Sequence, residues 1–123
     1  KSALESVGYA INQHFRIFRE HRVPMNKIMA TGGGTKNPLW LQLIADITGE
    51  TIRTPQNTIG ASFGDAMMAA MGIHYFSDYG ELTALVKEGP YYNPDSDRHR
   101  SYQTYQAIFD ELYLATKDLA HRL

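Results

Sequence analysis

Three consecutive glycines, Gly32, Gly33 and Gly34, are the residues of this sequence that most clearly suggest chemistry. Glycine has no Cβ, so it permits unusual backbone angles and lets bare main chain approach another molecule closely. Asn37 follows shortly after them and carries an amide that can hydrogen-bond a sugar or a base. The stretch therefore suggests a nucleotide site lined by backbone, although a flexible link between two elements would use the same glycines.

Two well-known nucleotide-binding motifs do not match this stretch. A P-loop needs Gly-Lys followed by Ser or Thr, whereas Lys36 lies between Thr35 and Asn37. A dinucleotide-binding domain needs Gly-x-Gly-x-x-Gly and a following acidic residue, and neither follows here. We therefore discard a dinucleotide-binding domain. Lys36 could approach a phosphate, but a solvated lysine is the simpler explanation.

The glycines lie between a predicted strand and a predicted helix. Residues 25–31 are short and apolar without alternation, as expected for a strand of a parallel sheet covered on both faces. Asn37 suits the N-cap of the helix, Pro38 its first turn, and Gly49 the left-handed position after its end. An apolar stripe along this helix is formed by Leu39, Trp40, Leu43, Ile44 and Ile47.

A second short strand is predicted over residues 51–54, before Pro55. The two strands and the helix between them form a βαβ unit, whose crossover should be right-handed. In sheets of this kind ligands bind beyond the carboxyl ends of the strands, which is where the glycines would lie.

Two amphipathic helices are predicted near the ends of the chain. The first has an apolar stripe from Leu4 to Phe18, ends within residues 19–22 and is stopped by Val23-Pro24. The last begins in the mixed charge run of residues 97–100, which is most simply a solvated helix start, and continues close to the C-terminus. Its tyrosine-rich face suits a boundary between core and water, and would equally suit a second subunit, so a homodimer is left open.

Two shorter helices are predicted between them. Residues 61–71, closed by Gly72, are crowded with small residues, which fits close packing against a neighbouring element. The functional alternative is that the bare first turn of this helix lies against a ligand. Residues 81–87 form a short helix ended by Gly89-Pro90, and residues 91–95 are extended.

Two aspartates stand out by their places in these helices. Asp46 is late in its helix, where a carboxylate opposes the helix dipole, so we expect it to have a partner and a structural role. Asp65 is early in its helix, where the dipole favours a carboxylate. The five histidines show no spacing typical of metal ligands.

The run from Thr31 to Trp40, followed by Ala45-Asp46, resembles the C-terminal domain of the FGGY carbohydrate kinases, most closely their xylulokinase-like members. The resemblance continues through residues 60–70 and through Tyr92-Asn93-Pro94, and it reaches back to residues 3–7. Essentially the whole chain is covered, in the family's order and spacing. Asp65 is a departure, because many family members carry a small apolar residue there, and this weakens the choice of sugar.

The resemblance implies a fold and a domain. The fold would be α/β and helix-rich, part of an actin-like/RNase H-like ATPase domain with a short, mostly parallel sheet and flanking helices. Residues 1–123 would be the latter part of the C-terminal, nucleotide-binding domain, and the N-terminal sugar-binding domain would be absent. The start at Lys1 rather than at methionine agrees with that expectation.

The resemblance also implies a function. The complete enzyme would use ATP and Mg²⁺ to phosphorylate a sugar, with a pentulose such as D-xylulose as the leading candidate. Gly33, Gly34 and Asn37 fall on the family's adenosine-binding positions, and Gly32 shapes the loop. The family's catalytic base and most sugar contacts lie upstream, so no catalytic residue is assigned here and the chain alone should be inactive.

Composition limits the alternatives. With 123 residues and 43% hydrophobic residues, the chain can form one domain with one core. Its formal charge of −1 gives no reason to expect nucleic acid or an anionic membrane as a partner. The absence of cysteine fits a reducing cytoplasm. The second interpretation to weigh is a non-catalytic interaction domain, in which the glycine loop is a structural turn.

Overall fold

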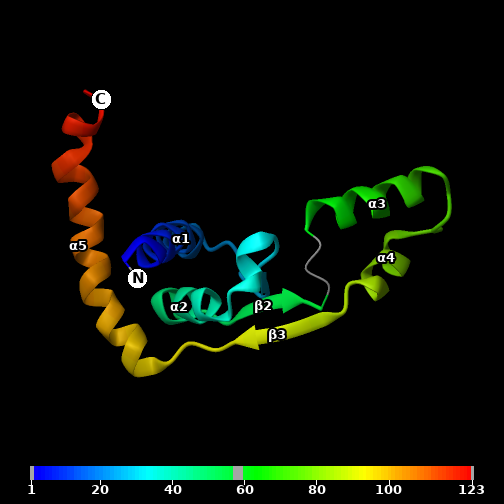
Figure 1. Ribbon diagram of the computed structural model, residues 1–123, viewed down its shortest axis with the longest axis horizontal. Helices are drawn as coiled ribbons and strands as arrows, with labels where there is room; N and C mark the ends of the chain where they lie inside the picture. Colours follow the sequence, from blue (N-terminus) through cyan, green and yellow to red (C-terminus); the bar gives the residue numbers. More distant parts are fainter. Residues whose placement is uncertain (1, 57–59, 123) are drawn as a thin grey trace.

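The computed structural model describes residues 2–56 and 60–122 (Figure 1). In that part of the chain the α-helices are α1 (Ser2–Glu20), α2 (Pro38–Thr48), α3 (Ala61–Gly72), α4 (Tyr79–Leu85) and α5 (Ser96–Ala120). The strands and the one 3₁₀ helix are β1 (Ile28–Met29), η1 (Gly33–Lys36), β2 (Ile52–Pro55) and β3 (Glu88–Tyr92). The helix-rich α/β class predicted from the sequence is confirmed.

The ends of α2 follow from local chemistry, as predicted. The Asn37 side chain accepts a hydrogen bond from the Trp40 backbone N–H at 3.2 Å, and Pro38 opens the helix. At the other end Gly49 adopts the left-handed conformation, with φ 73°, and its N–H donates to the Ala45 carbonyl at 2.9 Å. These two caps fix where the helix begins after the glycine loop and where it ends.

The sheet is more evenly mixed than predicted. β1 pairs with β2 in parallel, as the βαβ unit requires, but β3 pairs with β2 in antiparallel register. The strand predicted over residues 25–31 is short, because the chain turns away at Gly32, where φ is 97°. Beyond β1 the ladder is extended by the Ala30 N–H, which donates to the Arg53 carbonyl at 2.8 Å.

β3 corrects the prediction for residues 81–95. Gly89 and Pro90, expected to end a helix, lie within this strand. Proline is tolerated there because β3 is at the edge of the sheet and has a partner on one side only. The preceding helix α4 begins earlier than predicted, because the Asp78 carboxylate accepts from the Glu81 N–H at 3.1 Å and caps it.

The core lies around α2, which packs against α1, β2 and α5 (Figure 1). One cluster joins α2 to β2 through Leu41, Ile44, Ala45 and Ile52. A second joins α2 to α1 and α5 through Leu43, Ile47 and Tyr9, with Phe109 and Tyr102 against them. Burial, with the Glu5 carboxylate nearby, raises the pKa of Tyr9 to about 12, so this phenol stays neutral in the core.

α3 and α4 stand apart from this body, at the far ends of β2 and β3 (Figure 1). Leu82 of α4 is buried, whereas no residue of α3 is. No helix of the described residues is both long and apolar enough to cross a membrane. Within the same residues, no three His, Asp or Glu side chains are grouped closely enough to hold a metal ion.

Candidate functional site

The glycine loop is a hydrogen-bonded turn rather than an irregular link. Gly32 has φ 97° and ψ −176°, a conformation that favours glycine. Its carbonyl accepts two hydrogen bonds from Thr35, one from the backbone N–H at 3.2 Å and one from the hydroxyl at 2.7 Å. The Asn37 N–H then donates to the Gly34 carbonyl at 3.1 Å. These bonds hold the loop as the single turn η1 between β1 and α2.

The three glycines differ in what surrounds them. A Cβ on Gly32 or on Gly33 would meet no atom of the described residues within 4 Å, so main chain is bare on that side among them. A Cβ on Gly34 would lie 2.4 Å from Cζ3 of Trp40, so this glycine makes room for the indole ring. The predicted site residues therefore divide into two that present open backbone and one with a packing role.

Asn37 is exposed and performs the capping role that the sequence predicts. Since its Oδ1 accepts from the Trp40 N–H, its Nδ2 is the atom left to face another molecule. Lys36 is exposed beside it. The predicted contact of Asn37 with a nucleotide is compatible with this geometry and stays a prediction.

A cavity of about 310 Å³ lies beyond the strand ends, between the end of β1 and the start of α3. Its lining includes Met29 and Thr31 before the glycine loop, and Gly60, Ala61 and Phe63 around the first turn of α3. None of Gly32, Gly33, Gly34 and Asn37 is among the lining residues. The loop does border this region, because a Cβ on Gly60 would lie 3.7 Å from the Cα of Gly32.

Sequence reasoning missed the apolar part of this lining. Phe63 and Met67 of α3 face the cavity, and Leu85 and Val86 close it from the end of α4. The spacing of Phe63 and Met67, one helical turn apart, was the signal available in the sequence. The first turn of α3 lines this cavity, which is compatible with the alternative prediction that this turn lies against a ligand. Asp65 is exposed and does not line it.

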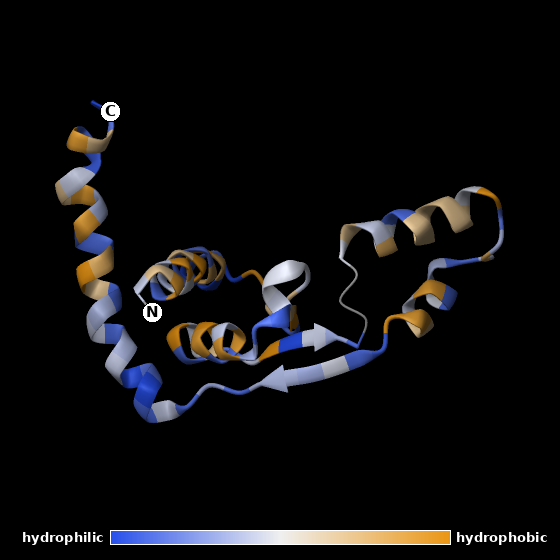
Figure 2. Ribbon diagram, viewed as in Figure 1, coloured by the Kyte–Doolittle hydropathy of each residue, from blue (hydrophilic) through white to orange (hydrophobic). Residues whose placement is uncertain are grey.

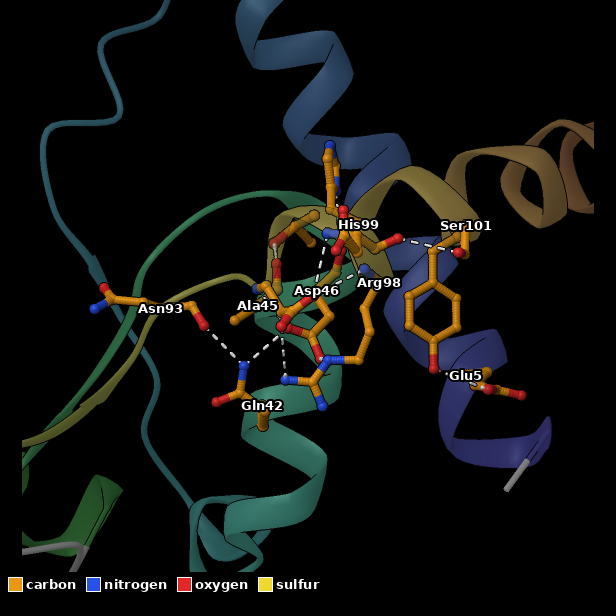
Figure 3. A network of polar contacts seen from close by, with 12 residues as sticks. Glu5, Gln42, Ala45, Asp46, Asn93, Arg98, His99 and Ser101 are labelled. Carbon is orange, nitrogen blue, oxygen red and sulfur yellow. Dashed lines mark hydrogen bonds and ion pairs between the residues drawn. The ribbon is translucent and has the colours of Figure 1, made fainter.

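The strongest polar network holds α5 against α2 and is centred on Asp46 (Figure 3). Asp46 is 2% exposed; its Oδ2 lies 3.2 Å from Nε of Arg98, and its Oδ1 accepts from Gln42 Nε2 at 2.8 Å and from the Asp95 N–H at 2.9 Å. The expected partner of Asp46 thus exists, and a structural role at the junction of α2 and α5 stays a prediction.

Residues 97–100 were predicted to be a solvated helix start, but two of them, Arg98 and His99, contact Asp46 of α2. The His99 Nδ1 lies 2.9 Å from the Asp46 carbonyl, near the end of α2 (Figure 3). Because a carbonyl can only accept, Nδ1 carries the proton, and the other ring nitrogen accepts from the Gln103 amide at 2.9 Å. Asp97, Arg98 and Arg100 are exposed and His99 is half-buried, so the run is solvated except at His99 and where the Arg98 guanidinium meets Asp46.

A second network joins α5 to α1 through Asp110. Its carboxylate accepts from Gln13 Nε2 at 2.8 Å, from Gln106 Nε2 at 2.8 Å and from Arg16. Burial favours the neutral acid, but these hydrogen bonds and the Arg16 charge outweigh it and lower the pKa of Asp110 below the ordinary value of 3.8. Ionised Asp110 therefore stabilises the contact between α1 and α5.

We expect this contact to weaken in acid. A lowered folded-state pKa gives stability that is present above the unfolded value of 3.8 and is lost as pH falls through the folded value. Asp110→Asn should lower the free energy of unfolding by about 1 kcal/mol near pH 7 and flatten its decline below pH 4. Urea unfolding at pH 7, 5 and 3 measures both effects. If the free energy of unfolding of Asp110→Asn declined with pH as steeply as that of the wild type, Asp110 would not be the group that links stability to pH here.

The sequence of this chain is similar to that of known sugar kinases. The family model described as "FGGY family of carbohydrate kinases, C-terminal domain" matches residues 1–73. Over 120 residues the chain is 31% identical to a xylulose kinase of Staphylococcus epidermidis and 28% identical to that of Bacillus subtilis. Each match covers 97% of this chain and 24% of the relative. The chain thus spans about a quarter of the length of these curated relatives.

A solved structure shows the same fold. The crystal structure of xylulose kinase from Rhodospirillum rubrum matches with a TM-score of 0.75 and 27% identity, over 96% of this chain and 24% of that one. The small mixed sheet and its helices therefore have a counterpart in about a quarter of that structure.

Proposed function

The chain belongs to the FGGY family of carbohydrate kinases, and on that premise we propose that the enzyme carrying it phosphorylates a sugar with ATP. The support is the match of residues 1–73 to the family model, together with the similarity of nearly the whole chain to xylulose kinases. We infer a pentulose such as D-xylulose as the sugar. We also propose that residues 1–123 form the latter part of the C-terminal domain of a cytoplasmic enzyme.

The contribution of this chain would be one wall of the ATP site. Open backbone at Gly32 and Gly33 leaves room for a flat group that any Cβ would obstruct, so these residues fit an adenosine. The exposed amide of Asn37 would supply a hydrogen-bond donor to the base or ribose. Gly34 would contribute its main chain while its missing Cβ accommodates Trp40.

Phosphoryl transfer needs several groups, and we propose that this chain provides only some of them. ATP, accompanied by Mg²⁺, provides the transferred group, and a base must accept the proton of the sugar hydroxyl that attacks it. We propose that this base and most sugar contacts lie outside this chain, as the family resemblance implies. The chain alone would then bind part of the nucleotide and catalyse nothing.

The test is an assay of the complete enzyme with ATP-Mg²⁺ against a sugar panel. We expect ADP release that requires a sugar and is fastest with D-xylulose, while other pentuloses, hexuloses and gluconate cover the remaining candidates. An enzyme that binds no adenine nucleotide would favour the non-catalytic interaction domain. Trp40, the only tryptophan of the chain, packs against Gly34 and would report nucleotide binding by fluorescence.

Two substitutions of Asn37 separate its two roles. Asn37→Asp keeps an oxygen for the Trp40 N–H but removes the Nδ2 donor, so we expect wild-type stability and about tenfold weaker ADP binding. Asn37→Ala should show the same loss of affinity and a further loss of about 1 kcal/mol in stability. Titration calorimetry with ADP and thermal unfolding give the two readouts. Unchanged affinity in both variants would remove Asn37 from the site.

A further inference from the structure

A second cavity, of about 510 Å³, lies where α1, the end of α2 and the first half of α5 meet. Its lining is rich in polar side chains, among them Asn12, Arg16, Arg19, Gln106 and Asp110. Figure 2 shows that α5 is hydrophilic over its first turns and carries hydrophobic bands further along. No residue lines both this cavity and the one beside the glycine loop. The volume suits a small polar molecule, bound apart from that loop.

The hydrogen-bond network of this cavity leaves one buried acceptor without a donor. Ionised Asp110 can only accept, so Gln106 donates its Nε2 to the Asp110 Oδ1 at 2.8 Å and turns its own Oε1 toward Asn12. Asn12 must then donate its Nδ2 to that oxygen, at 3.0 Å. The Asn12 Oδ1 is buried without a hydrogen-bond partner among the described residues, in a residue that is only 8% exposed. An acceptor of this kind needs a donor, and the cavity is where one can enter.

Two arginines line the solvent side of the same cavity. Arg16 and Arg19 are neighbours one turn apart on α1, and their side chains are 47% and 41% exposed. Arg16 pairs with Asp110, whereas Arg19 pairs with Glu50 and donates to the Thr48 carbonyl at 3.0 Å. Among the described residues these contacts use one terminal nitrogen of each guanidinium, which has five N–H groups in all. Both arginines can therefore bind an anion in addition to their carboxylates.

We propose that this cavity binds a sugar phosphate. The buried wall at Asn12 and Gln106 is uncharged, so a neutral hydroxyl group would donate to the Asn12 Oδ1 there. An ammonium group would lose its hydration for a single amide oxygen. The phosphate would lie toward solvent, where Arg16 and Arg19 can share its oxygens. Asp110 does not prevent this, because Arg16 and two amides already offset its charge.

Two sources could supply such a ligand. One is the product of the enzyme itself, and that identity rests on the proposed function. The other is a sugar phosphate made elsewhere, for which the cavity needs no kinase activity in the enzyme. The chemistry that the cavity recognises is the same in both cases, namely hydroxyl groups on a carbon chain that ends in a phosphate.

Titration calorimetry of the complete enzyme, with excess ADP and D-xylulose present to occupy the catalytic site, tests the proposal. We expect D-ribose 5-phosphate to bind at one site per chain, and both D-ribose and methyl phosphate to bind at least about tenfold more weakly. D-Xylulose 5-phosphate is the product arm: tighter binding than D-ribose 5-phosphate would identify the enzyme's own product as the ligand, and weaker binding a sugar phosphate made elsewhere. No binding of either sugar phosphate, or equal affinity for methyl phosphate, would overturn the proposal.

Arg19→Gln places the binding in this cavity, with Arg100→Gln as its matched control. Each substitution removes one positive charge from an exposed arginine, but Arg100 is 80% exposed on α5 and does not line the cavity. We expect Arg19→Gln to weaken the binding of D-ribose 5-phosphate about tenfold and Arg100→Gln to leave it unchanged. Equal affinities in the two variants would count against the site.

Hydrogen exchange of the wild-type enzyme keeps the test decisive if Arg19→Gln folds poorly. D-Ribose 5-phosphate should slow amide exchange in peptides from the second half of α1 and the first half of α5, while peptides from α3 stay unchanged. Protection confined to other parts of the enzyme would refute the site, and so would a cavity filled by the rest of the enzyme.

Discussion

Replacing Asp46 with alanine is expected to lower the free energy of unfolding by about 3 kcal/mol. The carboxylate is 2% exposed and is bonded to Arg98, to Gln42 and to the Asp95 N–H. Alanine would remove every one of these contacts and leave a space at the junction of α2 and α5. The Asp95 N–H would lose its acceptor just before the first turn of α5.

The ion pair alone does not account for that cost. The Arg98 side chain is 56% exposed, so it can return to water when its partner is removed. The Gln42 Nε2 keeps its bond to the Asn93 carbonyl at 2.7 Å, but the Asp95 N–H is fixed by the backbone and would lose its acceptor in a partly buried place. Asp46→Asn keeps one oxygen for these donors and should therefore cost only about 1 kcal/mol.

Urea unfolding of the chain, followed by Trp40 fluorescence and by circular dichroism, measures these differences. Asp65→Asn is the matched control, because Asp65 is an exposed aspartate on α3, remote from the core. We expect its stability within about 0.5 kcal/mol of wild type. Equal costs for Asp46→Ala and Asp46→Asn would show that the charge, rather than the hydrogen bonds, holds α5 in place.

Asp46 also shows which parts of the structure a sequence can predict. Its need for a partner follows from its own helix, because a carboxylate near a helix C-terminus is disfavoured. The caps of α2 follow in the same way from Asn37 and Gly49. The identity of the partner does not, because Arg98 belongs to a distant helix and its local sequence is that of a solvated run.

Non-local pairing explains the other differences. Gly89 and Pro90 read locally as a helix stop, and only their place at the edge of a sheet makes them part of β3. The same holds for the site. Bare backbone at Gly32 and Gly33 was predictable from residue type, whereas the packing of Gly34 under Trp40 depends on the direction in which α2 leaves the loop.

Alanine at Gly34 is expected to destabilise the chain by about 3 kcal/mol. The new Cβ would lie 2.4 Å from Cζ3 and 3.1 Å from Cε3 of Trp40, far inside van der Waals contact. The ring is a rigid group packed against both core clusters, and its Nε1 is buried without a hydrogen-bond partner among the described residues. Packing alone fixes its position, so a displaced ring disturbs the start of α2. Thermal unfolding measures the loss.

Alanine at Gly33 separates the site from the scaffold. Its Cβ would meet no atom within 4 Å in the part of the chain that the structure describes, and its φ is not in the left-handed region, so stability should stay within about 0.5 kcal/mol of wild type. In the complete enzyme the same methyl group would stand where we place the adenosine, so ADP affinity should fall about tenfold. Gly72→Ala, at the end of α3, has equally open space among the described residues and lies outside the cavity lining, so it controls for the loss of a glycine as such. Wild-type ADP affinity in Gly33→Ala would mean that the bare backbone of this loop faces solvent, and that the glycines serve the turn and Trp40 alone.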